Sequence, residues 1–97
     1  MGKAWAVKVR YTKRAAAQIA AALDYVAAQS PQGAGRISDR LQVLMMLLQN
    51  HPQAGRPTTH PGRRRIAPNP YPYLIDYRVT DTEIIILRFR HAARRPI

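Results

Sequence analysis

The stretch that decides the fold is YPYLIDYRVTDTEIIILRFR, residues 71–90. Its first half alternates between the two faces of an extended chain, which predicts a strand over residues 71–79. One face of this strand holds Tyr73, Ile75, Tyr77 and Val79, and the other holds Leu74, Asp76 and Arg78. The polar run Thr80-Asp81-Thr82 predicts a turn. Residues 83–90 predict a second strand with Ile85, Leu87 and Phe89 facing the core, so the stretch forms an antiparallel hairpin.

The segment before this hairpin predicts one more strand and a loop. Residues 63–67 (RRRIA) are short and extended in character, and they complete a three-stranded meander. Residues 51–62 (HPQAGRPTTHPG) hold three prolines and two glycines, which predicts a loop.

The first half of the chain predicts a short strand and two helices. Apolar and polar residues alternate over 5–10, which predicts a strand. Thr12 is a suitable N-cap for a helix over residues 12–29. Ser30-Pro31 ends that helix and starts another, because serine suits an N-cap and proline suits the first helical position. The apolar positions of the first helix are Ala16, Ile19, Ala20, Leu23, Val26 and Ala27.

The second helix has an apolar residue on more than one side. Its main face holds Ile37, Leu41, Leu44, Met45 and Leu48. Val43 and Met46 lie roughly opposite, which indicates either deeper burial within this domain or contact with a partner. The whole pattern predicts an α+β fold in one domain, residues 1–97: an N-terminal strand, a two-helix hairpin and a three-stranded antiparallel meander.

Composition narrows the partners. The chain has 97 residues, 16 Lys and Arg against 5 Asp and Glu, and a formal net charge of +11. The positive electrostatic field of such a chain favours an acidic partner, either nucleic acid or protein. The alternative is that the charge only keeps the protein soluble. The chain has no cysteine, which excludes disulfides and a cysteine nucleophile and favours the cytoplasm.

Several site classes are disfavoured by the sequence. His51 and His60 lack a third ligand at useful spacing, so no metal site is expected. No cofactor motif is present. The longest apolar run, residues 43–48, is too short to cross a membrane, so no membrane partner is expected.

Strand parity predicts a cationic sheet face. If the helices cover one face of the meander, the other presents Asp76, Arg78, Arg88 and Arg90. The strand at 63–67 adds either Arg64, or Arg63 and Arg65, depending on register. Such a face suits phosphates or an acidic peptide, and a solvated face with scattered charge is the alternative.

The C-terminal stretch combines an imidazole with guanidinium groups. His91, Arg94 and Arg95 are the groups needed to move a proton and to stabilise charge on a phosphodiester. A structural role for His91 is the alternative.

Three segments together resemble a known family. They are residues 64–66 (RRI), 73–79 (YLIDYRV) and 84–96 (IIILRFRHAARRP). In this order and spacing they resemble the RelE/ParE toxins of type II toxin–antitoxin systems, most closely the ParE branch. The short strand, the alanine-rich segment 12–29 and the segment 37–48 agree with it. The resemblance implies the fold predicted above and a cognate, ParD-like antitoxin whose acidic or amphipathic segment wraps the toxin.

The branch decides the expected activity. ParE-like toxins inhibit DNA gyrase, whereas RelE-like toxins cut mRNA in the ribosome. The resemblance to ParE implies a toxin that binds its target without chemistry of its own. We expect the target to be contacted by Arg88, Arg90, His91, Arg94 and Arg95, and the antitoxin by Arg64, Arg78, Val43 and Met46.

Two alternatives stay open at this point. A RelE-like ribonuclease would use His91, Arg94, Arg65 and Arg88, but the lysines typical of that branch are missing after Lys13 and no tyrosine follows Tyr77. A non-toxic module that binds nucleic acid directly is the other alternative.

Overall fold

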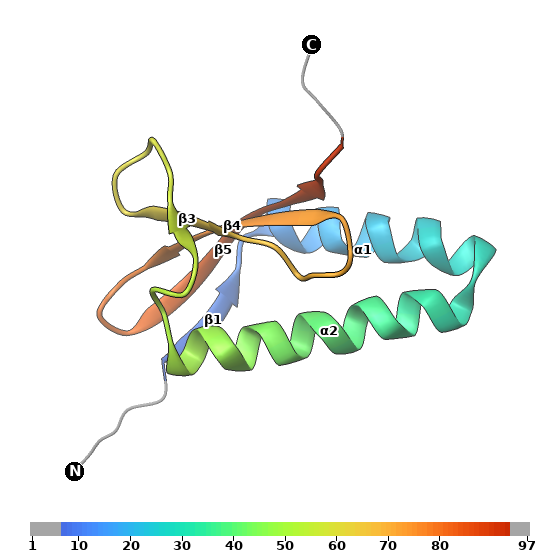
Figure 1. Cartoon of the computed structure of the whole chain (residues 1–97), viewed down its shortest axis with the longest axis horizontal. Coiled ribbons are helices and arrows are strands. Elements are labelled where there is room, and N and C mark those ends of the chain that lie inside the picture. Colours follow the sequence, from blue (N-terminus) through green and yellow to red (C-terminus); the bar gives the residue numbers. More distant parts are fainter. Residues whose placement is uncertain (1–6, 94–97) are drawn as a thin grey trace.

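The computed structural model describes residues 7–93, which form two helices packed on a five-stranded sheet (Figure 1). In chain order the elements are β1 (Lys8–Tyr11), α1 (Lys13–Gln29), α2 (Pro31–Asn50), β2 (Arg56–Pro57), β3 (Arg63–Ile66), β4 (Tyr73–Val79) and β5 (Glu83–His91). The strand order is β1-β5-β4-β3-β2; β1 runs parallel to β5 and the other pairs are antiparallel. The predicted α+β class and element order are confirmed.

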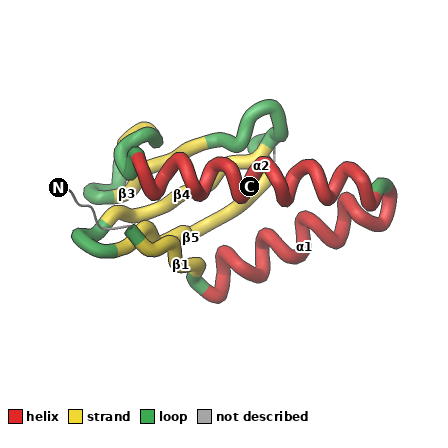
Figure 2. Tube along the Cα trace, turned by 90° about the horizontal axis from the view of Figure 1, so that it is seen from below, coloured by secondary structure: helices red, strands yellow, loops and turns green. Residues whose placement is uncertain are grey.

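Both predicted helix caps are present. The Thr12 hydroxyl accepts a hydrogen bond from the Ala15 amide at 3.0 Å, and the Ser30 hydroxyl accepts one from the Gly33 amide at 2.9 Å. Each cap satisfies a backbone donor that the first helical turn leaves free. Figure 2 shows that the two helices form a hairpin on one side of the sheet, with their connection reaching beyond the strands.

The predicted core face of α2 is confirmed. Ile37, Leu41, Leu44, Met45 and Leu48 are all buried, and they meet the buried Tyr73, Ile75, Tyr77, Ile84, Ile86 and Phe89 of the sheet. Burial of each large apolar side chain contributes about 1.5–3 kcal/mol, so this face holds the helical hairpin on the sheet.

The predicted core face of α1 is partly wrong. Ala16 and Ala20 are exposed, whereas Ala15 is fully buried. Ile19, Leu23 and Val26 pack against the core as predicted, and Ala15 and Ala22 join them because α1 packs against β5 as well as against α2.

A β-bulge changes which side chains of β5 face the helices. Tyr77 pairs with Ile86 and Asp76 pairs with Arg88, so Leu87 has no partner across the ladder. The expectation that Ile85 and Leu87 face the core is therefore wrong. Ile84 and Ile86 are buried before the bulge, and Phe89 is buried after it, as predicted.

The start of α1 holds the edge of β5 at this bulge. The Thr12 hydroxyl donates to the Leu87 carbonyl at 3.3 Å. The Gln18 side-chain oxygen accepts from the Phe89 amide at 2.8 Å. Because β1 pairs only as far as Ile86, these side chains satisfy backbone groups that the parallel ladder no longer reaches.

The predicted loop 51–62 contains the two-residue strand β2, which pairs with β3. A buried tyrosine anchors the preceding turn: the Tyr77 hydroxyl donates to the Pro52 carbonyl and accepts from the Gly55 amide, each at 2.8 Å. A Cβ on Gly55 would lie 2.7 Å from that hydroxyl, so the close approach requires glycine. Of the predicted strand 5–10, residues 5 and 6 lie outside the described residues.

Candidate cationic site on the uncovered sheet face

The strand registers gather cationic side chains on the sheet face opposite the helices. Arg63 pairs with Arg78 and Arg65 pairs with Asp76, so β3 contributes Arg63 and Arg65 to this face. Side chains alternate between the two faces along each strand, so the registers of all five strands identify the other charged residues of this face. We define the arginine face by its cations Lys8, Arg10, Arg56, Arg63, Arg65, Arg78, Arg88 and Arg90, together with the acids Asp76 and Glu83.

Like charges stand directly opposite each other on this face. Arg56 is the register partner of Arg65, and Arg63 is the register partner of Arg78. Directly opposed residues on neighbouring strands lie close enough to repel when their charges match. Asp76 offsets the charge of Arg65 in the first pair, whereas neither Arg63 nor Arg78 is bound by an acid of the described residues. An anionic partner would relieve the repulsion between these two arginines.

Asp76 lies on this face by register, as predicted, but its carboxylate is not available to a partner. The residue is 2% exposed. Arg65 covers it with two hydrogen bonds, Nε to Oδ1 at 2.6 Å and Nη2 to Oδ2 at 3.2 Å. The hydrogen bond to Asp76 raises the pKa of Arg65 above its usual value, against the opposing effect of burial. Both charges are thus committed to one bidentate pair.

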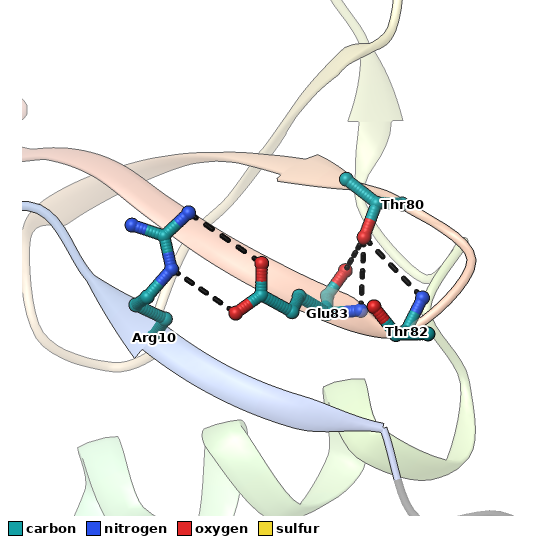
Figure 3. A network of polar contacts seen from close by, with 4 residues as sticks. All are labelled: Arg10, Thr80, Thr82 and Glu83. Carbon is teal, nitrogen blue, oxygen red and sulfur yellow. Dashed lines mark hydrogen bonds and ion pairs between the residues drawn. The ribbon is translucent and has the colours of Figure 1, made fainter.

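The second acid of the arginine face is also held by an arginine (Figure 3). Arg10 Nε lies 3.1 Å from Glu83 Oε2. Thr80 steadies the turn behind Glu83, because its hydroxyl accepts from the Glu83 amide at 2.9 Å and from the Thr82 amide at 3.3 Å. Every carboxylate that the described strands place on this face is therefore bound by a guanidinium.

Two guanidinium donors of this face have no acceptor within residues 7–93. They are Arg63 Nε and Arg88 Nε, and both atoms are buried from solvent. Buried polar groups without a partner are uncommon in native structures, so each calls for an explanation.

His91 lies on the opposite face from Arg88 and Arg90. It is the register partner of Tyr73, and its ring meets the Tyr73 ring edge-on with centroids 5.5 Å apart. Its Nδ1 accepts a hydrogen bond from the Ala93 amide at 3.1 Å. The described residues therefore do not bring His91 together with Arg65 and Arg88. Arg94 and Arg95 lie outside the described residues.

The four residues expected to meet an antitoxin occupy three separate places. Arg64 faces the same side as Tyr77, and its Nη1 donates to the Gly55 carbonyl at 2.7 Å. Arg78 is exposed on the arginine face. Val43 and Met46, 55% and 63% exposed, lie on the outer side of α2. The alternative that these two apolar side chains are buried within the domain is wrong.

Sequence reasoning missed four residues that bear on these surfaces. Leu47 is 40% exposed and extends the apolar strip beside Val43 and Met46. Lys8, Arg10 and Arg56 belong to the arginine face, but β1 is brought there only by parallel pairing, and Arg56 lies in a segment that the sequence predicts as a loop. The alternation of residues 7–10 was the one available signal for Lys8 and Arg10.

A small hollow adjoins the arginine face beside Arg56 and Arg65. It has a volume of about 230 Å³ and is lined by Ala54, Gly55, Arg56, Arg65, Ile66, Ala67, Asn69 and Leu74. Pockets for drug-sized ligands are about 300–1,000 Å³, so this hollow is the size of a side chain. Within residues 7–93, no group of three or more His, Asp or Glu side chains is placed to hold a metal ion, and no helix is long and apolar enough to cross a membrane.

The order of the elements, a short strand, a helical hairpin and then the remaining strands of the sheet, is the one that the resemblance to the RelE/ParE toxins implies. The family model described as "ParE toxin of type II toxin-antitoxin system, parDE" matches residues 9–96. The chain therefore belongs to the ParE toxin family, within the RelE/ParE group that its sequence resembles, and it is a type II toxin.

Individual relatives agree with this assignment. The chain is 38% identical over 87 residues to Toxin RelE2 of Caulobacter vibrioides, an alignment covering 90% of this chain and 97% of that protein. It is similar to a chain of the chromosomal ParDE system from P. aeruginosa, with a TM-score of 0.75, 28% identity and coverage of 89% and 96% of the two chains. The E. coli DinJ–YafQ toxin–antitoxin complex shares the fold, with a TM-score of 0.60, 18% identity and coverage of 92% and 96%.

Proposed function

We propose that this toxin inhibits DNA gyrase by binding, and performs no chemistry of its own. The observation that supports binding over nuclease chemistry is the position of His91. General acid–base catalysis needs the imidazole within hydrogen-bond reach of the reacting group, with cations beside the developing charge. Here the imidazole and the arginines occupy opposite faces of the sheet, and Arg65 is already paired with Asp76.

The target contact proposed here is the end of β5. Arg88 and Arg90 share the arginine face and lead directly into the segment that carries Arg94 and Arg95. Guanidinium groups bind carboxylates and phosphates through paired N–H donors, and both kinds of acceptor occur in a protein–DNA complex. In this proposal His91 is a structural residue that packs on Tyr73.

We further propose that a ParD-like antitoxin neutralises the toxin and meets the apolar strip of Val43, Met46 and Leu47. Exposed apolar side chains at helical spacing suit the apolar face of a second helix. Met46→Glu should weaken antitoxin binding by about tenfold or more while leaving thermal stability unchanged, because the side chain is exposed. Gln32→Glu, an equally charged change at an exposed position on the same helix about four turns from Met46, is the control. Equal weakening by both variants would contradict an apolar contact.

The second candidate is a ribosome-dependent endoribonuclease. It is favoured by the similarity to Toxin RelE2 and by the positions of Arg65 and Arg88 on either side of Asp76 in one cross-strand row. It requires His91→Gln to abolish mRNA cleavage with the fold unchanged.

The deciding experiment is a supercoiling and DNA-cleavage assay with purified gyrase and the isolated toxin. Loss of supercoiling or accumulation of cleaved DNA, reversed by antitoxin, is the expected result. Arg94→Ala with Arg95→Ala should weaken inhibition and leave antitoxin binding largely intact, whereas His91→Gln should inhibit as the parent does. No effect of folded toxin in large molar excess, together with codon-positioned cuts in translated mRNA that His91→Gln removes, would replace this proposal with the second candidate.

A further inference from the structure

The arginine face has more positive charge than the acids of residues 7–93 neutralise. Arg63 stands directly opposite Arg78, and two buried guanidinium donors, Arg63 Nε and Arg88 Nε, have no acceptor within residues 7–93. Each feature is unfavourable in the isolated chain, the first through repulsion and the second through desolvation. A ligand that brings negatively charged acceptors would relieve both.

The face already shows how it holds a carboxylate. Arg65 grips Asp76 through two N–H groups, and Arg10 holds Glu83 from the neighbouring edge of the sheet. Both acids come from a strand, and each meets a guanidinium of the adjacent strand. Carboxylates on an extended segment are therefore the kind of acceptor that this surface accommodates.

The spacing of the arginines on the two strands beside β4 favours a particular kind of peptide segment. Arg88 and Arg90 lie two residues apart on β5, and Arg63 and Arg65 lie two residues apart on β3, with β4 between them. A two-residue step along a strand is about 6.8 Å. An extended peptide repeats its side chains at this same distance on one side, whereas a helix does not.

We propose that the arginine face binds an extended acidic peptide segment whose carboxylates alternate along its sequence. The segment lies over β4, between the arginines of β3 and those of β5, and it supplies acceptors to Arg63 and Arg88. The hollow beside Arg56 and Arg65, which has the size of a side chain, takes one further residue of the segment at the edge of the sheet. This inference extends the proposed function: such a segment in an antitoxin would cover Arg88 and Arg90 and so block the proposed target contact.

A protein segment fits this face better than nucleic acid does. Proteins that bind single strands usually combine cations with aromatic rings on which bases stack. The aromatic residues of the sheet, Tyr11, Tyr73, Tyr77 and Phe89, all lie on the helix side by register. The uncharged side chains of the arginine face, Leu74 and Ile85, offer no such platform.

The test is a direct binding measurement with two synthetic peptides of the same composition and charge. In one, glutamate alternates with threonine; in the other, all the glutamates are contiguous. Fluorescence anisotropy at physiological ionic strength, with the whole toxin, should give an affinity about tenfold higher for the alternating peptide, since only that peptide places all of its carboxylates on one side of an extended chain, whereas a contiguous run divides them between the two sides.

Variants separate site binding from general attraction between charges. Arg63→Gln with Arg88→Gln should lower the affinity for the alternating peptide by about tenfold or more. Arg14→Gln with Arg36→Gln removes the same charge from exposed positions on the helices and should change it by about twofold or less. Circular dichroism checks that both double variants are folded.

Three results would overturn the inference. Equal affinity for the two peptides would show that register plays no part. An equal loss in the two double variants would show that only net charge matters. Tighter binding of single-stranded oligouridylate or oligothymidylate than of the alternating peptide would make the face a nucleic-acid surface. The assay contains neither gyrase nor antitoxin, so its failure would leave the gyrase proposal standing, and failure of the gyrase assay would leave this inference standing.

Discussion

The Tyr77 hydroxyl offers the sharpest test of how the segment before β2 is held. It is buried, donates to the Pro52 carbonyl and accepts from the Gly55 amide, each at 2.8 Å. Tyr77→Phe removes both hydrogen bonds without changing the packing of the ring. Each bond contributes about 1 kcal/mol net, and the buried Gly55 amide left without an acceptor adds a further penalty.

The free energy of unfolding should therefore fall by about 2–3 kcal/mol. For a domain of this size, that corresponds to a melting temperature lower by about 10–20 °C. Urea denaturation followed by circular dichroism measures the loss, and amide hydrogen exchange should show the Gly55 N–H losing protection at the same time.

Tyr73→Phe is the matched control. Tyr73 is also a buried tyrosine of β4, but its hydroxyl makes no hydrogen bond to any residue within 7–93, so its removal should change stability by less than about 0.5 kcal/mol. If Tyr77→Phe were as stable as Tyr73→Phe, the two hydrogen bonds would not exist in solution and the anchoring of the turn would need another cause.

Three further results are expected. Burial raises the pKa of Tyr77, so the stabilisation by its protonated hydroxyl is complete below the ordinary tyrosine pKa of about 10 and is lost as the pH rises through the raised pKa. The free energy of unfolding should therefore fall less steeply with alkaline pH in Tyr77→Phe than in the parent. Parallel curves for the two proteins would contradict this. Gly55→Ala should destabilise by about 2 kcal/mol, since its Cβ would lie 2.9 Å from the Arg65 carbonyl, whereas Gly35→Ala, with open space around it, should stabilise α2 by about 0.5–1 kcal/mol in the same thermal melts. Asp76→Asn should lower the free energy of unfolding by about 2 kcal/mol, less than the loss of a fully buried ion pair because the Arg65 side chain is 36% exposed. Added salt should reduce this loss by screening the charge left on Arg65. A loss that does not depend on ionic strength would show that charge is not its cause.

The helical half of the fold was predictable because its signals are local. Thr12, Ser30 and Pro31 mark helix starts by chemistry that acts within one turn, and the structure places a cap at each start. The five core residues of α2 follow from helical spacing alone. On α1, Ala15 and Ala22 meet the core in place of the predicted Ala16 and Ala20. This difference was not predictable, since the alanines look alike in sequence and only packing distinguishes them.

The sheet was predictable in outline but not in detail. The run Ile84-Ile85-Ile86-Leu87 is apolar throughout, so it carries no alternation from which to read a face. The bulge that sets the parity depends on hydrogen bonds to Thr12 and Gln18, more than sixty residues away in sequence. The arginine face was inferred correctly for Arg78, Arg88 and Arg90, because Phe89 lies beyond the bulge and fixes the parity there.

The candidate site was harder to predict than the fold. Asp76 reads in sequence as one charge among several on an open face, and only the pairing of β3 with β4 shows that Arg65 buries it. In the same way His91 follows Arg90 directly, yet a strand sends neighbouring side chains to opposite faces. The sequence therefore suggested that His91 and the arginines form one cluster, whereas the strand places them on opposite faces of the sheet.

The bulge at Leu87 also governs how the chain tolerates a change in length. Because Leu87 is the extra residue, a homologue one residue shorter at this point would form a regular ladder and still point the counterparts of Arg88 and Arg90 away from the helices. A deletion of Phe89 would instead leave the counterpart of Arg88 in place and turn the counterpart of Arg90 toward the helices. The junction between β1 and α1, where the Thr12 hydroxyl meets the Leu87 carbonyl, thus marks the place at which a change of one residue in length leaves the surface charge of this toxin intact.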